Sequence, residues 1–191
     1  MRICVFCGSS DGRHERYREA GRALGSMLAK AGIGVVYGGA TIGVMGAVAD
    51  GALAEGGEVI GVIPEAMMTV EIAHHRTDLR VVGTMHERKA LMAELSDAFI
   101  ALPGGIGTME EVFEVWTWAQ LGYHGKPVSL LDIDGYWDAL HRFVDHMVHE
   151  GFLRAAHREM LIIEDDASTL LERLKQYQPP KVDKLLRSEE R

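Results

Sequence analysis

Residues 102–111 read LPGGIGTMEE, and this stretch decides how the rest of the chain is interpreted. A short apolar segment, Ala98–Leu102, leads into Pro103 and then into three glycines within four positions, and a helical pattern starts at Thr108. This order predicts a β-strand that enters an α-helix through a glycine-rich turn. Because glycine has no Cβ, a ligand can lie close to the backbone of such a turn.

The start of the predicted helix suits an anion. We expect Thr108 to be the N-cap, because its hydroxyl can accept a hydrogen bond from the amide of Glu110 or Glu111. Free amides and the positive end of the helix dipole would then converge where a phosphate can bind. The same two glutamates place carboxylates beside that anion. Similar turns also join strand to helix in many α/β proteins without binding a ligand. The neighbouring segments therefore have to show whether this turn forms a ligand site.

The composition predicts one acidic globular domain. The 191 residues are 47% hydrophobic and carry a formal net charge of −8. A single domain over residues 1–178, followed by a charged and disordered tail over residues 179–191, is the simplest interpretation. The negative charge disfavours a broad nucleic-acid surface. The chain has no signal-peptide pattern and no apolar run of about 18 residues, so we expect a cytoplasmic protein with no membrane partner.

Neither the cysteines nor the adjacent histidines indicate a metal site. Cys4 and Cys7 lie on one predicted strand and point to opposite faces, so they are badly placed for a disulfide and too few for a zinc site. We expect two buried free thiols. The side chains of His74 and His75 diverge on an irregular segment, and no neighbour has ligand spacing. The sequence therefore predicts no metal and no cofactor.

Short apolar segments alternate with helical segments along the chain. This alternation predicts an α/β fold with one parallel sheet and helices on both faces. The expected strands are Arg2–Cys7, Val35–Tyr37, Glu58–Ile63, Leu79–Val82, Ala98–Leu102, Lys126–Leu131 and Leu161–Ile163. The expected helices are Glu15–Ala31, Val44–Glu55, Met85–Leu95, Thr108–Leu121, Tyr136–Gly151 and Ala167–Tyr177. Residues 65–78 have no sustained period and predict a functional flap or an irregular connector.

Three glycine-rich or polar loops follow predicted strands, namely Gly8–Asp11, Gly38–Gly43 and Pro103–Thr108. Ligands of parallel sheets gather at the carboxyl ends of the strands, so we expect the three loops to open on one edge. Their convergence predicts a site for a nucleotide or a phosphorylated sugar. The first loop lacks G-x-G-x-x-G and the chain contains no G-x-x-x-x-G-K-[ST], which disfavours an ordinary dinucleotide or NTPase site.

Two motifs carry a family resemblance. MHERK at Met85–Lys89 and PGGIGTMEE at Pro103–Glu111 resemble the LOG family of cytokinin riboside 5′-monophosphate phosphoribohydrolases, many bacterial members of which carry the label lysine decarboxylase. Further matches are FCGSS (6–10), YGGATIGVMG (37–46), VIGVIP (59–64), SDAFIALPGG (96–105) and TWAQLGYHGKP (117–127). The matches follow one another in the family's order.

The resemblance implies a homodimer with a Rossmann-like fold that hydrolyses the N-glycosidic bond of an adenine-type nucleoside 5′-monophosphate. The positions that match the family's catalytic pair are Arg88 and Glu111. Those that match its substrate contacts are Glu71, Arg88, Lys89, Gly104, Gly105, Ile106, Gly107, Thr108, Met109, Glu110, Glu111 and Thr117. Around Glu71, the segment Thr69–Asp78 departs from the family pattern, which leaves the preference for the N6 substituent of the base open.

The chemistry of these residues fits the implied reaction. Breaking a ribosyl C–N bond builds positive charge on the ribose and negative charge on the departing base, so a carboxylate such as Glu111 can stabilise the ribose and orient a water. Arg88 stays protonated and is expected to stabilise charge on the base or the phosphate. Lys89 could add a second positive charge near the phosphate. Glu110 points about 100° away from Glu111 around the helix, in a supporting or surface position.

Other interpretations stay open at this level. By position alone, Arg88 and Glu111 read as ordinary helix-surface charges. A non-catalytic nucleotide or molybdenum-cofactor carrier would share the fold and the glycine loops, although the presence of both residues favours catalysis. A lysine decarboxylase would need a pyridoxal phosphate Schiff base, and nothing around Lys89 or Lys126 resembles such a site. We expect the helix Met85–Leu95 to form the dimer interface.

Overall fold

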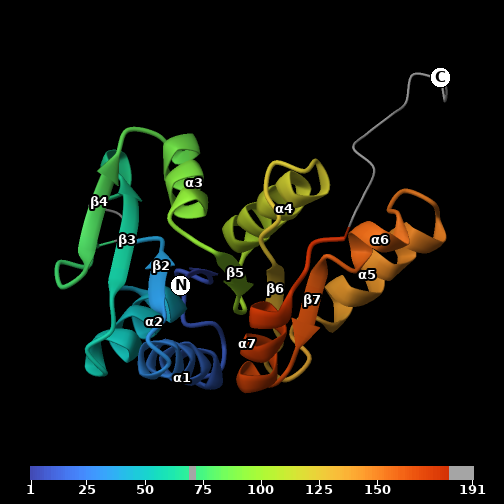
Figure 1. Cartoon of the computed structure of the whole chain (residues 1–191). Coiled ribbons are helices and arrows are strands. Elements are labelled where there is room, and N and C mark those ends of the chain that lie inside the picture. The colour runs from blue at the N-terminus through green and yellow to red at the C-terminus, as the bar shows by residue number, and fades with distance from the viewer. Residues whose placement is uncertain (69–71, 181–191) are drawn as a thin grey trace.

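The computed structural model describes residues 1–68 and 72–180 of the chain. Within these residues, seven parallel strands form one sheet in the order β4-β3-β2-β1-β5-β6-β7 (Figure 1). The strands are β1 (Arg2–Phe6), β2 (Gly34–Tyr37), β3 (Val59–Pro64), β4 (Asp78–Val82), β5 (Ala98–Ala101), β6 (Val128–Leu131) and β7 (Leu161–Glu164). The prediction of a parallel α/β sheet is confirmed.

The strand order reverses beside β1. The chain winds outward from β1 through β2 and β3 to β4, and then returns to place β5 on the other side of β1. The register pairs Val5 with Ile100 and Phe6 with Ala101, so β1 and β5 end at the same level. Ligands of doubly wound sheets bind in the crevice at such a reversal, outside the carboxyl ends of the strands. The loops after β1 and β5 therefore start side by side at the expected place for a site.

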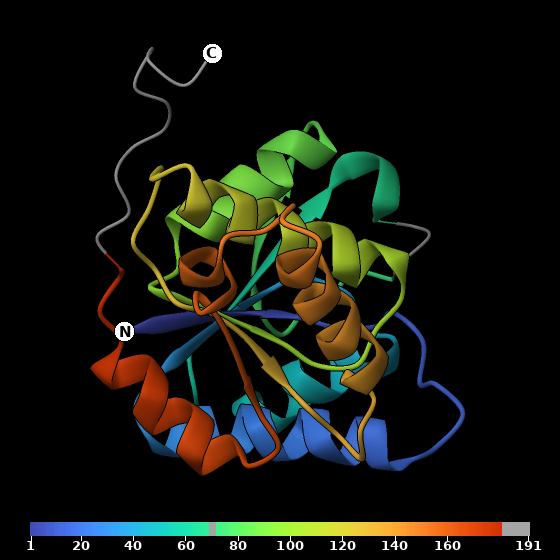
Figure 2. The same ribbon diagram turned by 90° about the vertical axis from the view of Figure 1, so that its right-hand side faces the viewer.

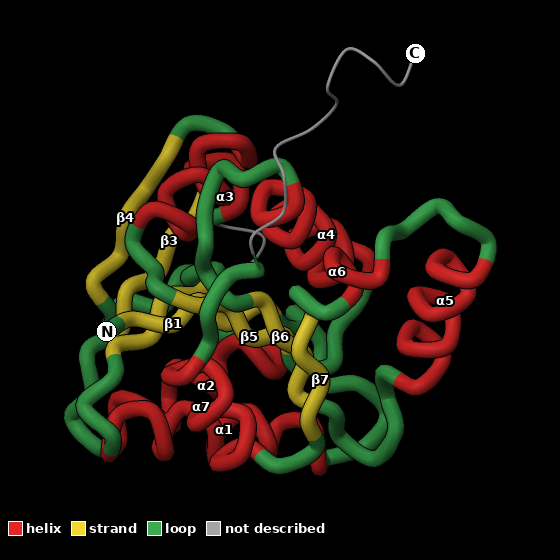
Figure 3. The backbone as a smooth tube through the Cα atoms, turned by 45° about the vertical axis from the view of Figure 1, so that its right-hand side comes forward, coloured by secondary structure: helices red, strands yellow, loops and turns green. Residues whose placement is uncertain are grey.

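Helices cover both faces of the sheet (Figure 2, Figure 3). They are α1 (Arg16–Lys30), α2 (Gly43–Ala54), α3 (Met85–Glu94), α4 (Ile106–Gln120), α5 (Asp138–His149), α6 (Ala155–Arg158) and α7 (Ala167–Gln176), with a short 3-10 helix η1 (Glu65–Met67). One core cluster joins the sheet to α1, α2 and α7, and a second joins it to α3, α4 and α5. Cys7 belongs to the first cluster and Cys4 to the second, and both are free and buried, as predicted.

Helices α1 and α2 touch through their backbones. A Cβ on Gly25 would lie 2.1 Å from the Val48 carbonyl oxygen, and a Cβ on Gly51 would lie 2.1 Å from the Arg22 carbonyl oxygen. Real Cβ atoms do not approach oxygen so closely, so these two glycines allow the two helices to interlock.

Gly25→Ala is expected to destabilise the protein by about 1–3 kcal/mol, because the added methyl must push α1 away from α2. Equilibrium denaturation in urea would measure the change. The sign of the effect is diagnostic, since alanine normally stabilises a helix interior by about 1 kcal/mol relative to glycine. An increase in the free energy of unfolding would contradict the interlocked packing.

The predicted helix starts differ from the structure by one residue at α1 and α2 and by two residues at α4 and α5, and the prediction misses two short helices. Helix α4 begins at Ile106 instead of Thr108, and α5 begins at Asp138 instead of Tyr136. Before α5, the chain turns at Asp134 and Gly135, both with positive φ, so Tyr136 lies in the turn and not in the helix. The short helices η1 and α6 carry too few residues to show a helical period.

Two features of the sequence prediction fall outside the residues that the structure describes. Glu71 and the tail from residue 181 onward lie outside them. Among the helices of residues 1–68 and 72–180, none combines the length and apolar character needed to span a membrane.

Candidate active site

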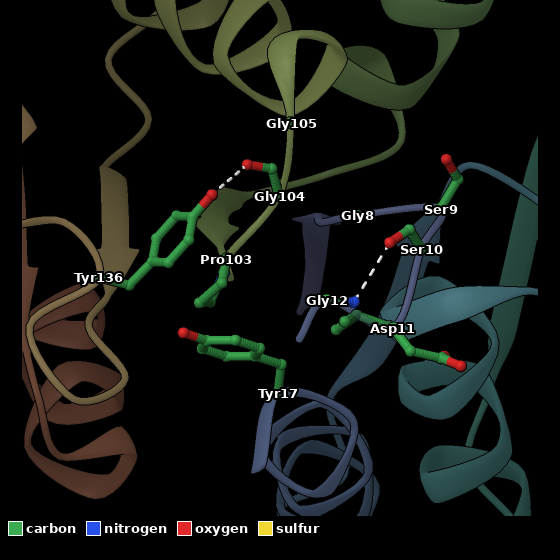
Figure 4. Close-up of a pocket in the computed structure, with 11 residues that line it drawn as sticks. Gly8, Ser9, Ser10, Asp11, Gly12, Tyr17, Pro103, Gly104, Gly105 and Tyr136 are labelled. Carbon is green, nitrogen blue, oxygen red and sulfur yellow. Dashed lines mark hydrogen bonds between the residues drawn. The ribbon is translucent and has the colours of Figure 1, made fainter. Parts of the chain in front are cut away.

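Two adjoining cavities open at the carboxyl ends of β1 and β5. The first, which we call the arginine lobe, has a volume of about 300 Å³ and is lined by Cys7, Gly8, Ser9, Met45, Met67, Met85, Arg88, Gly105, Ile106, Gly107, Thr108, Glu110 and Glu111. The second, the tyrosine lobe, has a volume of about 290 Å³ and is lined by Gly8, Ser9, Ser10, Asp11, Gly12, Tyr17, Val44, Pro103, Gly104, Gly105 and Tyr136 (Figure 4). The lobes share Gly8, Ser9 and Gly105.

The predicted convergence is confirmed for two of the three glycine-rich or polar loops. Gly8–Asp11 and Pro103–Thr108 both line the cavities, and the Gly8 amide donates a hydrogen bond of 3.2 Å to the Pro103 carbonyl. The third loop, Gly38–Gly43, contributes indirectly. It leads into α2, where the Met45 amide donates to the Gly8 carbonyl at 3.2 Å.

Helix α4 begins at Ile106, two residues earlier than the sequence predicts. Gly105 is the N-cap, in an extended conformation and without a side-chain cap, and the Met109 amide makes the first helical hydrogen bond to the Gly105 carbonyl at 3.1 Å. The amides of Ile106, Gly107 and Thr108 therefore have no acceptor within the helix and line the arginine lobe. The start of a helix with free amides is chemically suited to an anion.

Thr108 is consequently not the N-cap, and that prediction was wrong. Its side chain is buried and packs against Gly104, since a Cβ on Gly104 would lie 2.1 Å from the Thr108 hydroxyl oxygen. Gly105 supplies the extended backbone before the helix, and no side chain caps it. Thr108 instead fixes the inner side of the turn.

Arg88 is buried at the start of α3, with only 4% of its surface exposed. Its Nε donates to the Val62 carbonyl at 3.1 Å and its Nη2 donates to the Gly38 carbonyl at 2.8 Å. The guanidinium is thus held by the main chain near the ends of β3 and β2. Gly38 leaves space for it, because a Cβ there would lie 2.2 Å from Nη2. Burial and these contacts exclude the interpretation of Arg88 as an ordinary surface charge.

Capping of α3 fixes the direction in which Arg88 enters the cavity. The Thr84 hydroxyl accepts from the Glu87 amide at 3.1 Å, and the Glu87 carboxylate accepts from the Gly83 amide at 2.8 Å. Thr84 is therefore a side-chain N-cap of α3, and Glu87 ties the helix start to the residue before the cap, unlike a standard capping box, in which it would bond the Thr84 amide.

Methionines surround the guanidinium on its cavity side. Nη1 of Arg88 lies 3.9 Å from the Met67 sulfur and 3.8 Å from the Met85 sulfur, and Met45 lines the same lobe. Methionine side chains are apolar, polarizable and adaptable. The arginine lobe therefore combines a fixed cation with a soft apolar wall.

Glu111 lines the arginine lobe together with Arg88. The negative charge of Glu111 also affects the pKa values of two cysteines in and directly after β1. Burial raises the pKa of the Cys7 thiol, and the Glu111 carboxylate raises it further. Burial likewise raises the pKa of Cys4, with Glu111 adding to the effect and Arg88 partly opposing it. Both thiols therefore stay protonated and do not supply a nucleophile.

Lys89 lies outside the set of described residues that line either lobe. It is 8% exposed, and its Nζ lies 2.5 Å from Glu110 Oε1 and 3.0 Å from Glu114 Oε1. Burial acts to lower the pKa of Lys89, but the hydrogen bonds to Glu110 and Glu114 outweigh it and the pKa is raised. Its charge is thus directed at two carboxylates of α4, so Lys89 ties α3 to α4.

The remaining candidate residues lie in different places. Met109 packs against the core cluster beneath α4, and Thr117 is exposed farther along the helix, where it does not line either described lobe. Glu71 lies outside the described residues. His74 is buried, with Nε2 3.4 Å from the Asp50 carboxylate. Within residues 1–68 and 72–180, no group of three or more His, Cys, Asp or Glu side chains could hold a metal ion.

Sequence reasoning missed the aromatic side of the site. Tyr17 and Tyr136 line the tyrosine lobe, and their rings meet edge to face with centroids 5.7 Å apart. Tyr136 follows β6, so the rule that sites form at the carboxyl ends of strands covers it. Tyr17 lies in the first turn of α1 and carries no such signal.

Comparison of the chain with known proteins relates it to a family. The sequence profile described as "Possible lysine decarboxylase" matches residues 45–174. The chain is 51% identical over 179 residues to a probable cytokinin riboside 5′-monophosphate phosphoribohydrolase of Oryza sativa subsp. japonica, covering 93% of this chain and 79% of that protein. It is 49% identical to a cytokinin riboside 5′-monophosphate phosphoribohydrolase of Arabidopsis thaliana, covering 93% and 83%.

Solved structures share the fold at lower identity. The molybdenum cofactor binding protein of Rippkaea orientalis aligns with a TM-score of 0.70 at 23% identity, covering 92% of this chain and 95% of that one. Such a likeness establishes the Rossmann-like architecture alone. The profile match and the plant relatives establish more: this chain belongs to the LOG family, whose plant members are named cytokinin riboside 5′-monophosphate phosphoribohydrolases.

Proposed function

We propose that this protein is a phosphoribohydrolase that cleaves the N-glycosidic bond of adenine-type nucleoside 5′-monophosphates, giving free base and ribose 5-phosphate. The observation that carries the proposal is the meeting of Arg88, Glu111 and the first amides of α4 in one cavity. Two separate helices supply these groups, α3 for Arg88 and α4 for Glu111 and the amides. The plant relatives at about 50% identity carry this activity in their names.

The 5′-phosphate binds at the start of α4. The amides of Ile106, Gly107 and Thr108 and the positive end of the helix dipole are the donors. Binding the phosphate there holds the ribose in place, so that binding energy remote from the reacting bond serves catalysis.

Glu111 and Arg88 then act on opposite ends of the breaking bond. Glu111 stabilises the positive charge that develops at C1′ and orients a water molecule towards that carbon. Arg88 stabilises the negative charge on the departing base and keeps its own proton. The C–N bond breaks with its electrons moving to the base, water forms the new C–O bond, and the proton from water completes the free base.

The methionine wall gives an apolar N6 substituent a place to bind. We expect the N6-isopentenyl form of AMP to be cleaved with a kcat/KM roughly ten-fold above that of AMP, because several CH₂ and CH₃ groups leave water. Met85→Gln should reduce this preference several-fold while kcat/KM for AMP changes by less than about two-fold. Steady-state kinetics on both nucleotides would measure it. Equal kcat/KM values in the wild type would contradict an apolar subsite.

We further expect a cytoplasmic homodimer. Of the two methionines of α3, Met92 is buried and turned to the core, so Met85, 41% exposed, is the one available at a surface. Ile106, 87% exposed, begins the neighbouring helix α4. Light scattering of the purified protein would give the mass in solution.

A direct assay tests the proposed function. Purified protein is incubated with AMP or its N6-isopentenyl form, and free base is separated by chromatography. Release of base and ribose 5-phosphate supports the hydrolase. Tight nucleotide binding without release would indicate a carrier, and lysine-dependent release of CO₂ with pyridoxal phosphate would indicate a decarboxylase.

A further inference from the structure

A side chain from a distant turn reaches the glycine-rich turn. The Tyr136 hydroxyl donates a hydrogen bond of 2.5 Å to the Gly104 carbonyl (Figure 4). Tyr136 comes from the turn between β6 and α5, whereas Gly104 follows β5. The bond therefore connects the ends of two neighbouring strands at the rim of the site.

The Gly104 carbonyl is a sensitive point of the anion site. Gly104 immediately precedes the N-cap Gly105, so the orientation of the peptide between them sets the direction in which α4 starts. Two adjacent glycines allow many orientations of that peptide. On its inner side Gly104 is confined by Thr108 and Gly8, because a Cβ there would lie 2.1 Å from the Thr108 hydroxyl oxygen and 2.8 Å from the Gly8 nitrogen. Tyr136 supplies the contact at its carbonyl.

Tyr136 is itself held in place although 40% of it is exposed. Its ring meets the Trp137 ring edge to face, with centroids 4.8 Å apart at 88°. Trp137 is buried, its Nε1 donates to the Leu131 carbonyl at 3.2 Å, and its amide donates to Asp132 Oδ1 at 2.9 Å. Tyr17 also packs edge to face against the Tyr136 ring, with centroids 5.7 Å apart. The phenol is therefore preorganised before any ligand binds.

We infer that Tyr136 is a positioning residue for phosphate, whose hydroxyl orients the Gly104–Gly105 peptide so that the first amides of α4 point at the anion. The inference rests on the proposed function, in which a nucleotide phosphate is the ligand of that turn. The residue lines the tyrosine lobe and lies outside the described lining of the arginine lobe, so it acts through the turn and not on the breaking bond.

Tyr136→Phe tests the inference, because it removes the hydroxyl and keeps the ring. We expect the KM for a nucleoside 5′-monophosphate and the Kd for inorganic phosphate to rise together by roughly five-fold, the effect of one lost hydrogen bond, with kcat changed by less than about two-fold. Tyr123→Phe is the control, because Tyr123 is 75% exposed and does not line either described lobe. It should leave all three quantities unchanged.

Other outcomes would overturn the inference. These are a fall in kcat at constant KM, or unchanged affinity for phosphate, in a Tyr136→Phe protein whose thermal unfolding matches the wild type. Calorimetry with inorganic phosphate separates this inference from the proposed function. A wild-type protein that releases no base but binds phosphate more tightly than Tyr136→Phe would remove the hydrolase proposal and retain the positioning role. Absence of phosphate binding to the wild type would remove the positioning role.

Discussion

Glu111→Gln is expected to reduce base release by roughly 10²- to 10³-fold or more, with little change in KM. The amide keeps the size of the side chain but removes the negative charge that stabilises the developing cation at C1′. Since the substitution leaves the proposed phosphate site at the start of α4 intact, ground-state affinity should be retained. Single-turnover measurement of free base from a saturating nucleotide gives the change in the chemical step directly.

Glu114→Gln is the matched control for this result. Glu114 lies one turn farther along α4, is paired with Lys89 and lies outside the described lining of both lobes. Its replacement removes one negative charge from the same helix and should change turnover by less than about three-fold. Equal losses in the two variants would show that helix charge, and not a carboxylate at C1′, controls the reaction.

Arg88→Ala is expected to lower kcat/KM by roughly 10²-fold or more and to reduce the free energy of unfolding by about 1–3 kcal/mol. Activity falls because no cation faces the departing base. Stability falls because the carbonyls of Val62 and Gly38 lose their donor in a buried place. Kinetics and urea denaturation on one preparation measure the two effects.

Arg88→Lys separates charge from geometry. Lysine keeps the positive charge but cannot span both carbonyls with a planar fork. We expect it to recover only a small part of the lost activity. Arg80→Ala on β4, an exposed arginine paired with Asp78, is the control for general loss of positive charge. Full activity in Arg88→Lys would contradict the need for an arginine held by two strand ends.

The parallel α/β fold could be predicted from the sequence because the same local patterns of strand and helix recur along the chain. Apolar strand segments such as Arg2–Phe6 alternate with amphipathic helices, and parallel strands force their following loops onto one edge. The local sequence pattern did not predict the start of α4 correctly at Thr108. A threonine before a helical period normally marks the N-cap, but the conformation of Gly104 and Gly105 moved the helix start, and glycine conformation depends on tertiary context.

The roles of the charged and aromatic residues depend on contacts between distant segments. Arg88 reads as a helix-surface charge until β2 and β3 bring the carbonyls of Gly38 and Val62 to it. Lys89 reads as a phosphate ligand until the packing of α3 on α4 pairs it with two carboxylates. Tyr136 bonds a main-chain carbonyl, and such a bond leaves no pattern in residue types.

The close packing at Gly25 and Gly51 holds α1 and α2 together on one side of the site. Because backbone meets backbone at Gly25 and Gly51, we expect the two helices to shift as a unit, together with the loops that precede them, Gly8–Asp11 and Gly38–Gly43. We therefore expect any opening that admits a nucleotide to come from the opposite side. There, α3 and the turn at Tyr136 meet the cavity through side chains, and α4 meets it through the main chain of its first turn.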